Sequence, residues 1–269
     1  MAENTPPLAT LLTDFGTADY YVAAVKGVIL SRVPSAVVVD ITHQISQGDI
    51  ATAAFLLHAA APAFPPGTVH LAVVDPGVGS DRRILVAEKN RQIFVAPDNG
   101  LLTYILVGGG LEDGTLDRCR VRSIERSDLY REAPGETFHG RDRFAPITAA
   151  LLAGERPEKL GLLIDDPILL DYEPPRQTDG ELLGQVIHID QYGNAVTNIP
   201  ADWLDAETFR ATIGDHHTER RASHYAALAP GEAAAITGSL GTLELSIPND
   251  SLAAAWGVER HAIVRVQLG

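Results

Sequence analysis

The first half of the chain alternates short apolar runs with stretches of helical periodicity. Between Tyr20 and Arg32 the apolar side chains recur on one helical face, and Asp49 is placed to cap an alanine-rich helix. Strands that alternate with helices are typical of a largely parallel sheet covered on both faces. We predict strands at 8–12, 37–41 and 69–74, a hairpin at 84–88 and 92–96, and helices at 20–32, 49–61 and 145–153.

The second half has a different pattern. Residues 165–180 are rich in proline and aspartate and have little periodicity, which is typical of a linker. Beyond them, short apolar runs separated by turn residues indicate a small β-barrel or sandwich. We predict strands at 183–189, 195–199, 209–213, 233–237, 242–247 and 262–267, and one short helix at 250–257. The expected organisation is an N-terminal α/β domain (1–165), a linker (166–180) and a C-terminal β-barrel domain (181–269).

Composition narrows the class of protein. The formal net charge of −14 argues against the phosphate contacts that nucleic-acid binding requires. The single cysteine, Cys119, excludes an intramolecular disulfide and a CxxC redox pair, so a reducing cytoplasm is the expected location. The N-terminal residues do not resemble a signal peptide, and no apolar run approaches the roughly 20 residues of a membrane span. We therefore expect a cytoplasmic protein with no nucleic-acid or membrane partner.

Six clusters of polar residues and glycine interrupt the apolar pattern, most of them where a predicted strand ends. In parallel sheets, ligands bind outside the carboxyl ends of the strands, and both Asp14 and Asp75 are placed there. Turns use the same residue types for local reasons, so each cluster taken alone also fits a structural role. The clusters lie at 13–16, 40–43, 75–83, 96–100, 137–142 and 190–194.

Several common catalytic motifs are missing from the chain. It has no P-loop, no GxGxxG fingerprint, no GxSxG nucleophile elbow and no HExxH metal motif. A di-metal site assembled from scattered aspartates and histidines stays open on these grounds. We expect neither a metal nor a redox cofactor.

Five motifs, in their order and spacing, resemble the S-adenosyl-L-methionine hydroxide adenosyltransferase family, which is related to fluorinating and chlorinating enzymes that attack the same substrate. The resemblance runs from about Ala9 to Val266. The motifs are Thr13-Asp14-Phe15-Gly16, Val74-Asp75-Pro76-Gly77-Val78-Gly79 with Arg82-Arg83, Pro97-Asp98-Asn99-Gly100, Thr137-Phe138-His139-Gly140-Arg141-Asp142, and Asp190-Gln191-Tyr192-Gly193-Asn194.

The resemblance implies a fold, an assembly and an activity. The fold is a Rossmann-like three-layer N-terminal domain with a C-terminal β-barrel domain. The assembly is a homotrimer, in which substrate lies between the N-terminal domain of one subunit and the barrel of its neighbour. The activity is hydrolysis of S-adenosyl-L-methionine to adenosine and L-methionine, by in-line attack of water on the ribose C5′ carbon.

The resemblance also implies roles for individual residues. A set of three, Asp75, Arg82 and His139, orients or activates water, and Asp14 holds the ribose hydroxyls. The residues implied at the two ends of the substrate are Asp190 and Ser239 for the methionine amine and carboxylate, and Tyr192 and Asn194, with Glu244, for adenine.

These residue types suit the implied chemistry. The sulfonium carbon is already activated, and methionine leaves as a neutral group, so no general acid is needed at sulfur. Free water is a poor nucleophile, with a pKa near ~15.7. A carboxylate such as Asp75 can position the water and accept its proton, and a second carboxylate, Asp14, can accept from both hydroxyls of a diol.

Other interpretations remain open at this point. Asp14 also fits a helix N-cap, Arg82 a surface ion pair, His139 a turn histidine and Asp190 a hairpin turn. A halide-dependent synthase of 5′-halo-adenosine is one alternative function, and a nucleoside-binding module without chemistry is another. Where the halogenating relatives carry a tryptophan, this chain has Gln47-Gly48-Asp49. A carboxylate beside the nucleophile repels an anion, which favours water.

Overall fold

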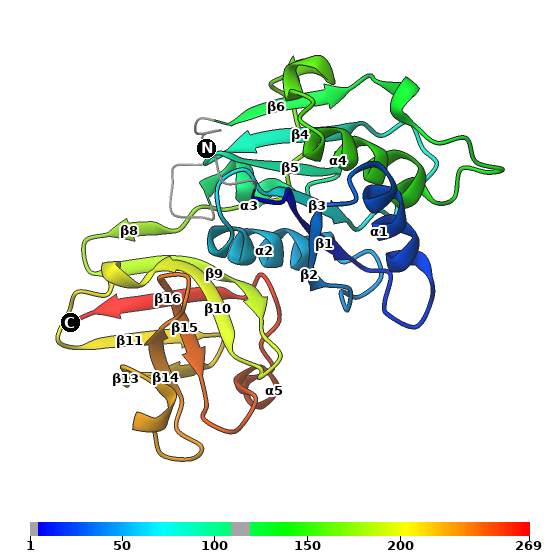
Figure 1. Ribbon diagram of the computed structural model, residues 1–269. Coiled ribbons are helices and arrows are strands. Elements are labelled where there is room, and N and C mark those ends of the chain that lie inside the picture. The colour runs from blue at the N-terminus through cyan, green and yellow to red at the C-terminus, as the bar shows by residue number, and fades with distance from the viewer. Residues whose placement is uncertain (1–4, 109–118) are drawn as a thin grey trace. The chain divides into compact units, whose positions relative to one another are not determined.

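A computed structural model describes residues 5–108 and 119–269 of the 269-residue chain. The described residues form two compact units, one of residues 5–106 and 119–170 and the other of residues 107–108 and 171–269. Each unit is built on its own β-sheet (Figure 1). The protein is therefore a mixed α/β fold of two sheet-based units. The domain boundaries predicted from the sequence, with a linker at 166–180 between domains at 1–165 and 181–269, remain a prediction.

The sheet of the first unit has seven strands in the order β2-β1-β3-β5-β4-β6-β7. The sequence pattern predicted a largely parallel sheet, but only the pairs β2–β1, β1–β3 and β3–β5 are parallel, whereas β5–β4, β4–β6 and β6–β7 are antiparallel. The β5–β4 hairpin reverses the direction through Asn90 and Arg91, which both have positive φ, as a tight hairpin turn requires. The strands are β1 Leu8–Thr13, β2 Val37–Thr42, β3 Val69–Val73, β4 Ile84–Lys89, β5 Gln92–Pro97, β6 Arg120–Ile124 and β7 Gly161–Ile164.

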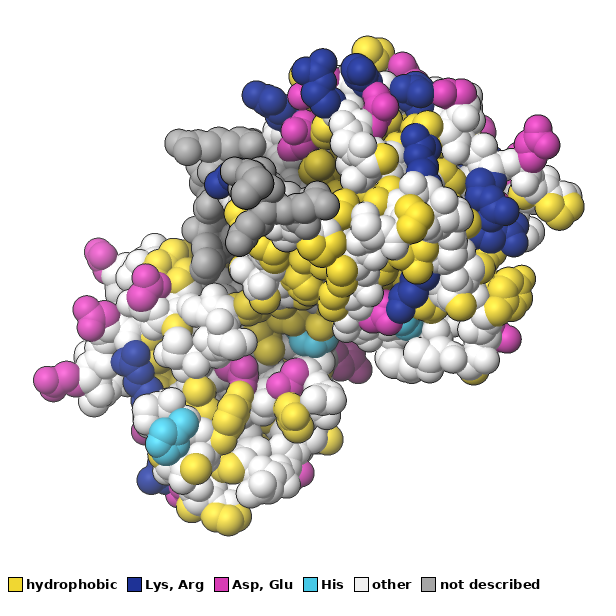
Figure 2. Space-filling view, viewed as in Figure 1, with side chains coloured by type: hydrophobic (Ala, Val, Ile, Leu, Met, Phe, Trp, Pro, Cys, Tyr) yellow, Lys and Arg dark blue, Asp and Glu magenta, His cyan; other side chains and the backbone are white. Residues whose placement is uncertain are grey.

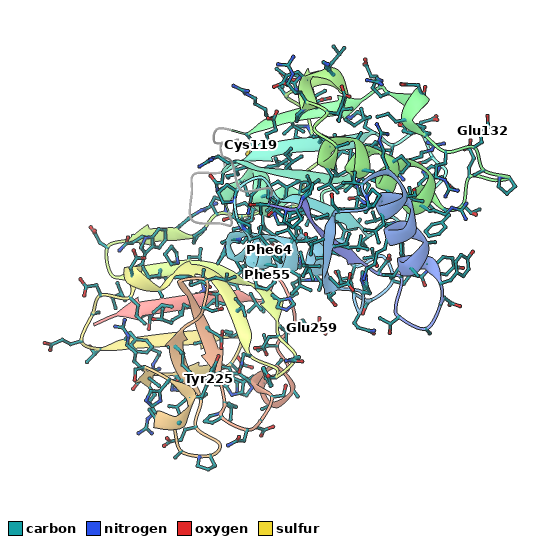
Figure 3. The ribbon with its side chains drawn as sticks, viewed as in Figure 1. Phe55, Phe64, Cys119, Glu132, Tyr225 and Glu259 are labelled. Atoms are coloured by element: carbon teal, nitrogen blue, oxygen red, sulfur yellow. The ribbon has the colours of Figure 1, made fainter. Side chains whose placement is uncertain are left out.

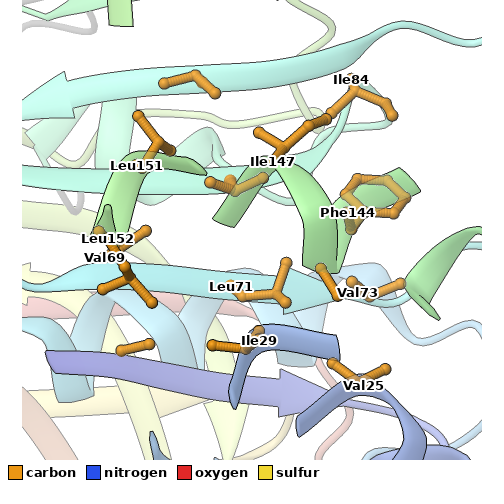
Figure 4. Close-up of a cluster of buried hydrophobic side chains, with 14 of the residues drawn as sticks. Val25, Ile29, Val69, Leu71, Val73, Ile84, Phe144, Ile147, Leu151 and Leu152 are labelled. Atoms are coloured by element: carbon orange, nitrogen blue, oxygen red, sulfur yellow. The ribbon is translucent and has the colours of Figure 1, made fainter. Parts of the chain in front are cut away.

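The buried side chains of this unit form two clusters, and each cluster includes helices. Helices α1 (Tyr21–Arg32) and α4 (Ala145–Leu152) pack in one buried cluster, part of which Figure 4 shows. Helices α2 (Ile50–Ala60) and α3 (Thr103–Leu106) pack in the other. Successive residues of β1 serve the two clusters: Leu11 lies in the first and Leu12 in the second, and both are fully buried. This double burial explains why β1 is apolar at consecutive positions.

The helix predicted at 49–61 is confirmed, and so is its cap. The Asp49 side chain accepts a hydrogen bond from the Thr52 amide at 3.1 Å, as an N-cap does. Strands β6 and β7 and the short helix α3 were not predicted. A π-helical turn, Gly140–Phe144, leads into α4 and was also missed. Short 3₁₀ turns lie at Ala61–Ala63, Ser127–Leu129, Pro157–Lys159, Ala201–Trp203 and Tyr225–Ala227.

The second unit is a curled half-barrel sheet. Its strand path runs β12-β11-β16-β9-β10-β15-β14-β13, with β8 paired to β9, and among the described residues no pairing joins β12 to β13. The short helix α5 is capped by Ser251 and ends at Gly257, which has the left-handed conformation that glycine favours. The elements are β8 Arg176–Thr178, β9 Glu181–Ile189, β10 Ala195–Pro200, β11 Phe209–Ile213, β12 His216–Thr218, β13 Arg221–Ala222, β14 Ala234–Thr237, β15 Thr242–Ser246, α5 Leu252–Trp256 and β16 Ile263–Leu268.

The surface is mixed in charge. On the face that Figure 2 shows, the Lys and Arg side chains of the first unit lie among Asp and Glu side chains. Such a distribution agrees with the acidic net charge of −14 and offers no broad basic face there. Within the part of the chain that the structure describes, no helix has both the length and the apolar character needed to cross a membrane.

Candidate active site

Asp75, Arg82 and His139 come together in the first unit. Asp75 follows strand β3, Arg82 precedes β4, and His139 precedes the π-helical turn. The guanidinium of Arg82 holds Asp75 through two bonds: Nε donates to Oδ1 at 2.7 Å, and Nη2 donates to Oδ2. The same Nη2 also donates to Nδ1 of His139 at 3.0 Å. The Arg82 and Asp75 side chains are only 8% and 5% exposed, so the surface ion-pair interpretation is wrong.

The contact with Arg82 determines which nitrogen of His139 carries the proton. A guanidinium only donates, so Nδ1 must accept and the neutral ring is protonated on Nε2. Burial lowers the pKa of His139, and the nearby charges of Arg143 and Arg82 lower it further, which favours the neutral ring. Within the described residues, Nε2 of His139 and Nη1 of Arg82 are buried without a hydrogen-bond partner. The site therefore presents two unused N–H donors and a carboxylate.

The local backbone around His139 is unusual. A π-helical turn is rare and often marks a functional site. It places Phe144 under the guanidinium of Arg82, whose Cζ lies 5.1 Å from the ring centroid. Phe144 is fully buried, so this cation–π contact has a fixed platform. The Arg82 guanidinium is therefore held at its edge by Asp75 and His139 and at its face by the Phe144 ring.

Asp14 lies in the loop after β1. Its Oδ2 accepts a hydrogen bond from the Gly48 amide at 2.9 Å, across 34 positions of sequence. Helix α1 begins at Tyr21 with no side-chain cap, so the N-cap interpretation of Asp14 is wrong. The segment Gln47-Gly48-Asp49 thus has two local roles: the Gly48 amide holds Asp14, and Asp49 caps α2. The other Asp14 oxygen has no hydrogen-bond partner among the described residues.

The loops that carry Asp14, Asp75 and His139 contact one another. Phe15 packs edge-on against Phe138, with ring centroids 5.8 Å apart. A Cβ atom added at Gly140 would lie 3.0 Å from the Phe15 ring, so glycine permits this close approach. A pocket of about 440 Å³ opens beside these rings. It is lined in part by Phe15, Tyr20, Tyr21, Thr137, Phe138 and Arg141.

Three of the candidate residues of the second unit line a hollow of about 960 Å³. Asp190, Tyr192 and Asn194 line it, and Tyr192 is 69% exposed. The Asp190 carboxylate accepts from the Tyr192 and Asn194 amides, each at 2.9 Å, and from the Asn194 side chain. These contacts form an Asx turn, so the hairpin-turn interpretation of Asp190 is correct. The turn presents the ring of Tyr192 to the hollow.

Tyr225 also lines this hollow and was not predicted from the sequence. Its side chain is labelled in Figure 3. Its hydroxyl donates to Oε1 of Glu244 at 2.5 Å. Burial raises the pKa of Glu244, despite the hydrogen bond from Tyr225. Burial, together with the bond to Glu244, also raises the pKa of Tyr225. Ser239 is exposed in the turn between β14 and β15 and is not among the residues that line the hollow.

Comparison with known proteins matches most of the chain to one family. Residues 9–161 match the SAM hydroxide adenosyltransferase N-terminal domain, and residues 184–265 match the C-terminal domain of the same family. The chain belongs to the SAM hydroxide adenosyltransferase family.

Named relatives include hydrolases and halogenating enzymes. The chain is 38% identical over 257 residues to the (R)-S-adenosyl-L-methionine hydrolase of Thermus thermophilus, covering 95% of this chain and 97% of the relative. It is 32% identical over 267 residues to the hydrolase of the same name from Salinispora tropica, covering 98% of each. A fluorinase of Nocardia brasiliensis is 30% identical over 220 residues, covering 72% and 71%.

Solved structures share the fold of this SAM hydroxide adenosyltransferase family member. An uncharacterized conserved protein from Thermotoga maritima superposes with a TM-score of 0.85 at 33% identity, covering 96% of this chain and 99% of that one. A conserved hypothetical protein from Thermus thermophilus superposes with a TM-score of 0.76 at 34% identity, covering 97% and 99%.

Two adjacent arginines of this family member have separate partners, which the sequence did not resolve. Arg82 contacts Asp75 and His139, as described above. Arg83 instead donates through Nε to Asp98 at 2.6 Å and through Nη1 to Asp166 at 2.8 Å. The bonds of Arg83 tie the end of β5 to the segment beyond β7. Among the described residues, no group of three or more His, Cys, Asp or Glu side chains is placed to hold a metal ion.

Proposed function

We propose that this protein hydrolyses S-adenosyl-L-methionine to adenosine and L-methionine. The observation that carries the proposal is 38% identity to an (R)-S-adenosyl-L-methionine hydrolase over nearly the full length of both chains. Relatives of this name also occur in Salinispora tropica and Methanocaldococcus jannaschii. Because their names specify the R configuration, we expect the R epimer at sulfur to be the better substrate.

The proposed reaction is an in-line displacement. The oxygen of water forms a bond to C5′ while the C5′–S bond breaks, and the electron pair goes to sulfur, which leaves as neutral methionine. The proton of the water passes to Asp75, whose oxygens each retain lone pairs beyond the bonds from Arg82. His139 positions the water as a donor, because its Nδ1 is engaged and its Nε2 already carries a proton.

The ribose is the proposed ligand of Asp14. One oxygen of this carboxylate is held by the Gly48 amide, which leaves the other oxygen to accept from the 2′- and 3′-hydroxyls. No step of this scheme needs a metal or a redox cofactor, because the sulfonium provides the leaving group.

The candidate residues of the second unit are the proposed ligands of the two ends of the substrate. Tyr192, Asn194 and Glu244 are assigned to adenine, and Asp190 and Ser239 to the methionine amine and carboxylate. The same proposal includes a homotrimer with a shared site, a Rossmann-like three-layer first domain, a barrel-type second domain and a cytoplasmic location.

Two other functions compete with hydrolysis. A halide-dependent synthase would place an anion where Asp75 lies, and the carboxylate would repel it. A nucleoside-binding module without chemistry would have no use for a buried carboxylate beside two unused donors, Nε2 of His139 and Nη1 of Arg82. Burying two N–H donors without hydrogen-bond partners costs free energy, and a protein that only binds a nucleoside would gain nothing from that cost.

The test is an incubation of the purified protein with each sulfonium epimer, with and without chloride. Chromatography should show adenosine and methionine in equal amounts, faster from the R epimer and independent of chloride. The double variant Asp75→Asn, His139→Ala is the control for a contaminating hydrolase. Formation of 5′-chloro-adenosine as the main product, or no turnover of either epimer, would overturn the proposal.

A further inference from the structure

A row of polar side chains connects α1, β2 and β1 in the first unit, and the proposed reaction does not use it. The row is buried at Thr13 and His43 and partly exposed at Lys26 and Asp40. Lys26 Nζ donates to Asp40 Oδ2 at 2.7 Å. The other Asp40 oxygen lies 3.1 Å from Nε2 of His43, and Nδ1 of His43 lies 2.8 Å from the hydroxyl of Thr13. Thr13 is fully buried, and the His43 side chain is 4% exposed. Because Thr13 cannot reach solvent or substrate, this row is not a nucleophile with its base.

The hydrogen bonds of the row have one consistent direction. The Thr13 oxygen already accepts from the Phe15 amide at 3.2 Å, so its proton is available to donate to Nδ1 of His43. The neutral ring then carries its proton on Nε2, which faces the Asp40 carboxylate. Within the described residues Nε2 of His43 makes no hydrogen bond of good geometry, so its contact with Asp40 is a close approach of 3.1 Å. The bond from Lys26 to Asp40, this approach, and the bond between Thr13 and His43 link the members of the row.

A β-bulge brings His43 to its place. Strand β1 pairs with β2 through Leu11 and Asp40, but the next pair is Leu12 with Thr42, so Ile41 is an extra residue. Without the bulge, His43 would lie at the level of Asp14. With it, His43 lies at the level of Thr13. Bulges occur at edge strands such as β2, where they re-aim a side chain.

His43 holds the backbone on both sides of Asp14. On one side its ring is bonded to Thr13, whose hydroxyl also fixes the Phe15 amide. On the other side its carbonyl oxygen accepts from the Gly16 amide at 2.9 Å. The Asp14 carboxylate itself is held by Gly48, five residues after His43. The loop after β2 therefore determines the direction of the Asp14 carboxylate.

We propose that His43, oriented by Asp40 and Thr13, is a positioning residue for the Asp14 carboxylate and thereby for recognition of the ribose diol. The inference rests on the proposed function, in which Asp14 binds the ribose. His43 touches no reacting atom in this scheme. Its removal changes affinity for the nucleoside and leaves the chemical step alone.

The same strand contains a matched control. Thr10 and His70 form an equivalent buried bond, with Oγ1 and Nδ1 2.7 Å apart, but they lie within the sheet, away from the Asp14 loop. Thr10→Val and Thr13→Val each remove one hydroxyl from β1 and leave Nδ1 of one buried histidine without its hydroxyl partner. A purely structural role predicts similar effects from both, whereas a positioning role does not.

The experiment measures adenosine affinity by calorimetry, and kcat and KM for S-adenosyl-L-methionine. Thr13→Val should weaken adenosine binding and raise KM by about tenfold, the loss expected for one buried hydrogen bond, while kcat changes less than about twofold. Thr13→Ser, which restores the hydroxyl, should behave like wild type. Thr10→Val should lower the melting temperature and leave the affinity for adenosine within about twofold of the wild-type value. In an Asp14→Asn background, Thr13→Val should weaken adenosine binding less than about twofold, because the carboxylate that His43 positions has already been removed.

The outcomes separate this inference from the proposed function. If the wild type hydrolyses the substrate but Thr13→Val and Thr10→Val affect affinity equally, or if Thr13→Val and Asp14→Asn act independently, the positioning role is wrong. If the wild type neither binds adenosine nor turns over the substrate, the proposed function fails and the inference fails with it. Should Thr13→Val not fold, Asp40→Ala removes the partner of His43 at a 40% exposed side chain, and should weaken adenosine binding about threefold or more. Unchanged affinity in that variant would overturn the inference.

Discussion

Replacement of Arg82 by lysine separates charge from geometry at the water site. Lysine keeps the positive charge but has one nitrogen, whereas Arg82 uses Nε and Nη2 for three contacts with Asp75 and His139. A single nitrogen cannot take the positions of Nε and Nη2 together, so we expect Arg82→Lys to lose the second bond of the fork and, with its different reach, the bond to His139. His139 then loses the donor at Nδ1, so its proton is free to move to that nitrogen, and Nε2 no longer presents a donor to water.

The magnitude follows from the lost contacts. A hydrogen bond to a charged group is worth about 1.5–3 kcal/mol when buried, and both side chains here are less than a tenth exposed. Loss of two such bonds at the low end is about 3 kcal/mol, or roughly 10²-fold in kcat. We expect Arg82→Lys and Arg82→Ala to fall within about threefold of each other.

The assay is the initial rate of adenosine formation under saturating substrate, with melting temperature as a check of folding. Arg83→Lys is the matched control, because Arg83 has carboxylate partners of its own, Asp98 and Asp166. This variant should keep kcat within about threefold of the wild-type value. If Arg82→Lys retains more than about a third of the wild-type kcat, the fork is not needed and the role assigned to Arg82 is charge alone.

Three further predictions concern the ribose, metals and acid stability. Asp14→Asn should weaken adenosine binding by about 1.5–3 kcal/mol and 2′-deoxyadenosine binding much less; equal losses would exclude Asp14 as the diol ligand. Activity should survive EDTA, because the neutral leaving group needs no Lewis acid, and a loss restored by one divalent ion would contradict this. Burial lowers the pKa of His70 from 6.5 to about 4, so the free energy of unfolding should fall by about 3 kcal/mol as pH drops from 6.5 to 4 and be unaffected by this group above 6.5. Urea titrations of the wild type and His70→Phe should differ in this pH window, and parallel curves would contradict the assignment.

The sequence pattern predicted the elements that bury an apolar face and placed Asp14 and Asp75 at strand ends. Strands β6 and β7 were not predicted, because their residues do not follow a simple apolar pattern. Arg120 and Arg122 interrupt β6, although Arg122 is buried and donates to a backbone carbonyl. In β7, Leu162 and Leu163 are 65% and 59% exposed, so their apolar character does not report burial.

Contacts over long sequence distances could not be predicted. Arg82 and Arg83 are adjacent and alike in chemistry, and only the fold shows that one contacts His139 and the other Asp166. The sequence pattern indicated the polar cluster at 40–43. It could not predict the bulge that shifts His43 by one position, because the bulge does not change the order of apolar and polar residues. Tyr225 was missed because it lies in a segment without periodicity and is defined by its bond to Glu244.

The most direct test of the central claim is hydrolysis in ¹⁸O-labelled water with mass analysis of both products. Attack of water at C5′ places one ¹⁸O atom in the 5′-hydroxyl of adenosine and none in methionine, in the presence or absence of chloride. Adenosine without the label, a label in methionine, or a 5′-halo-adenosine in place of adenosine would contradict a direct displacement by water at C5′.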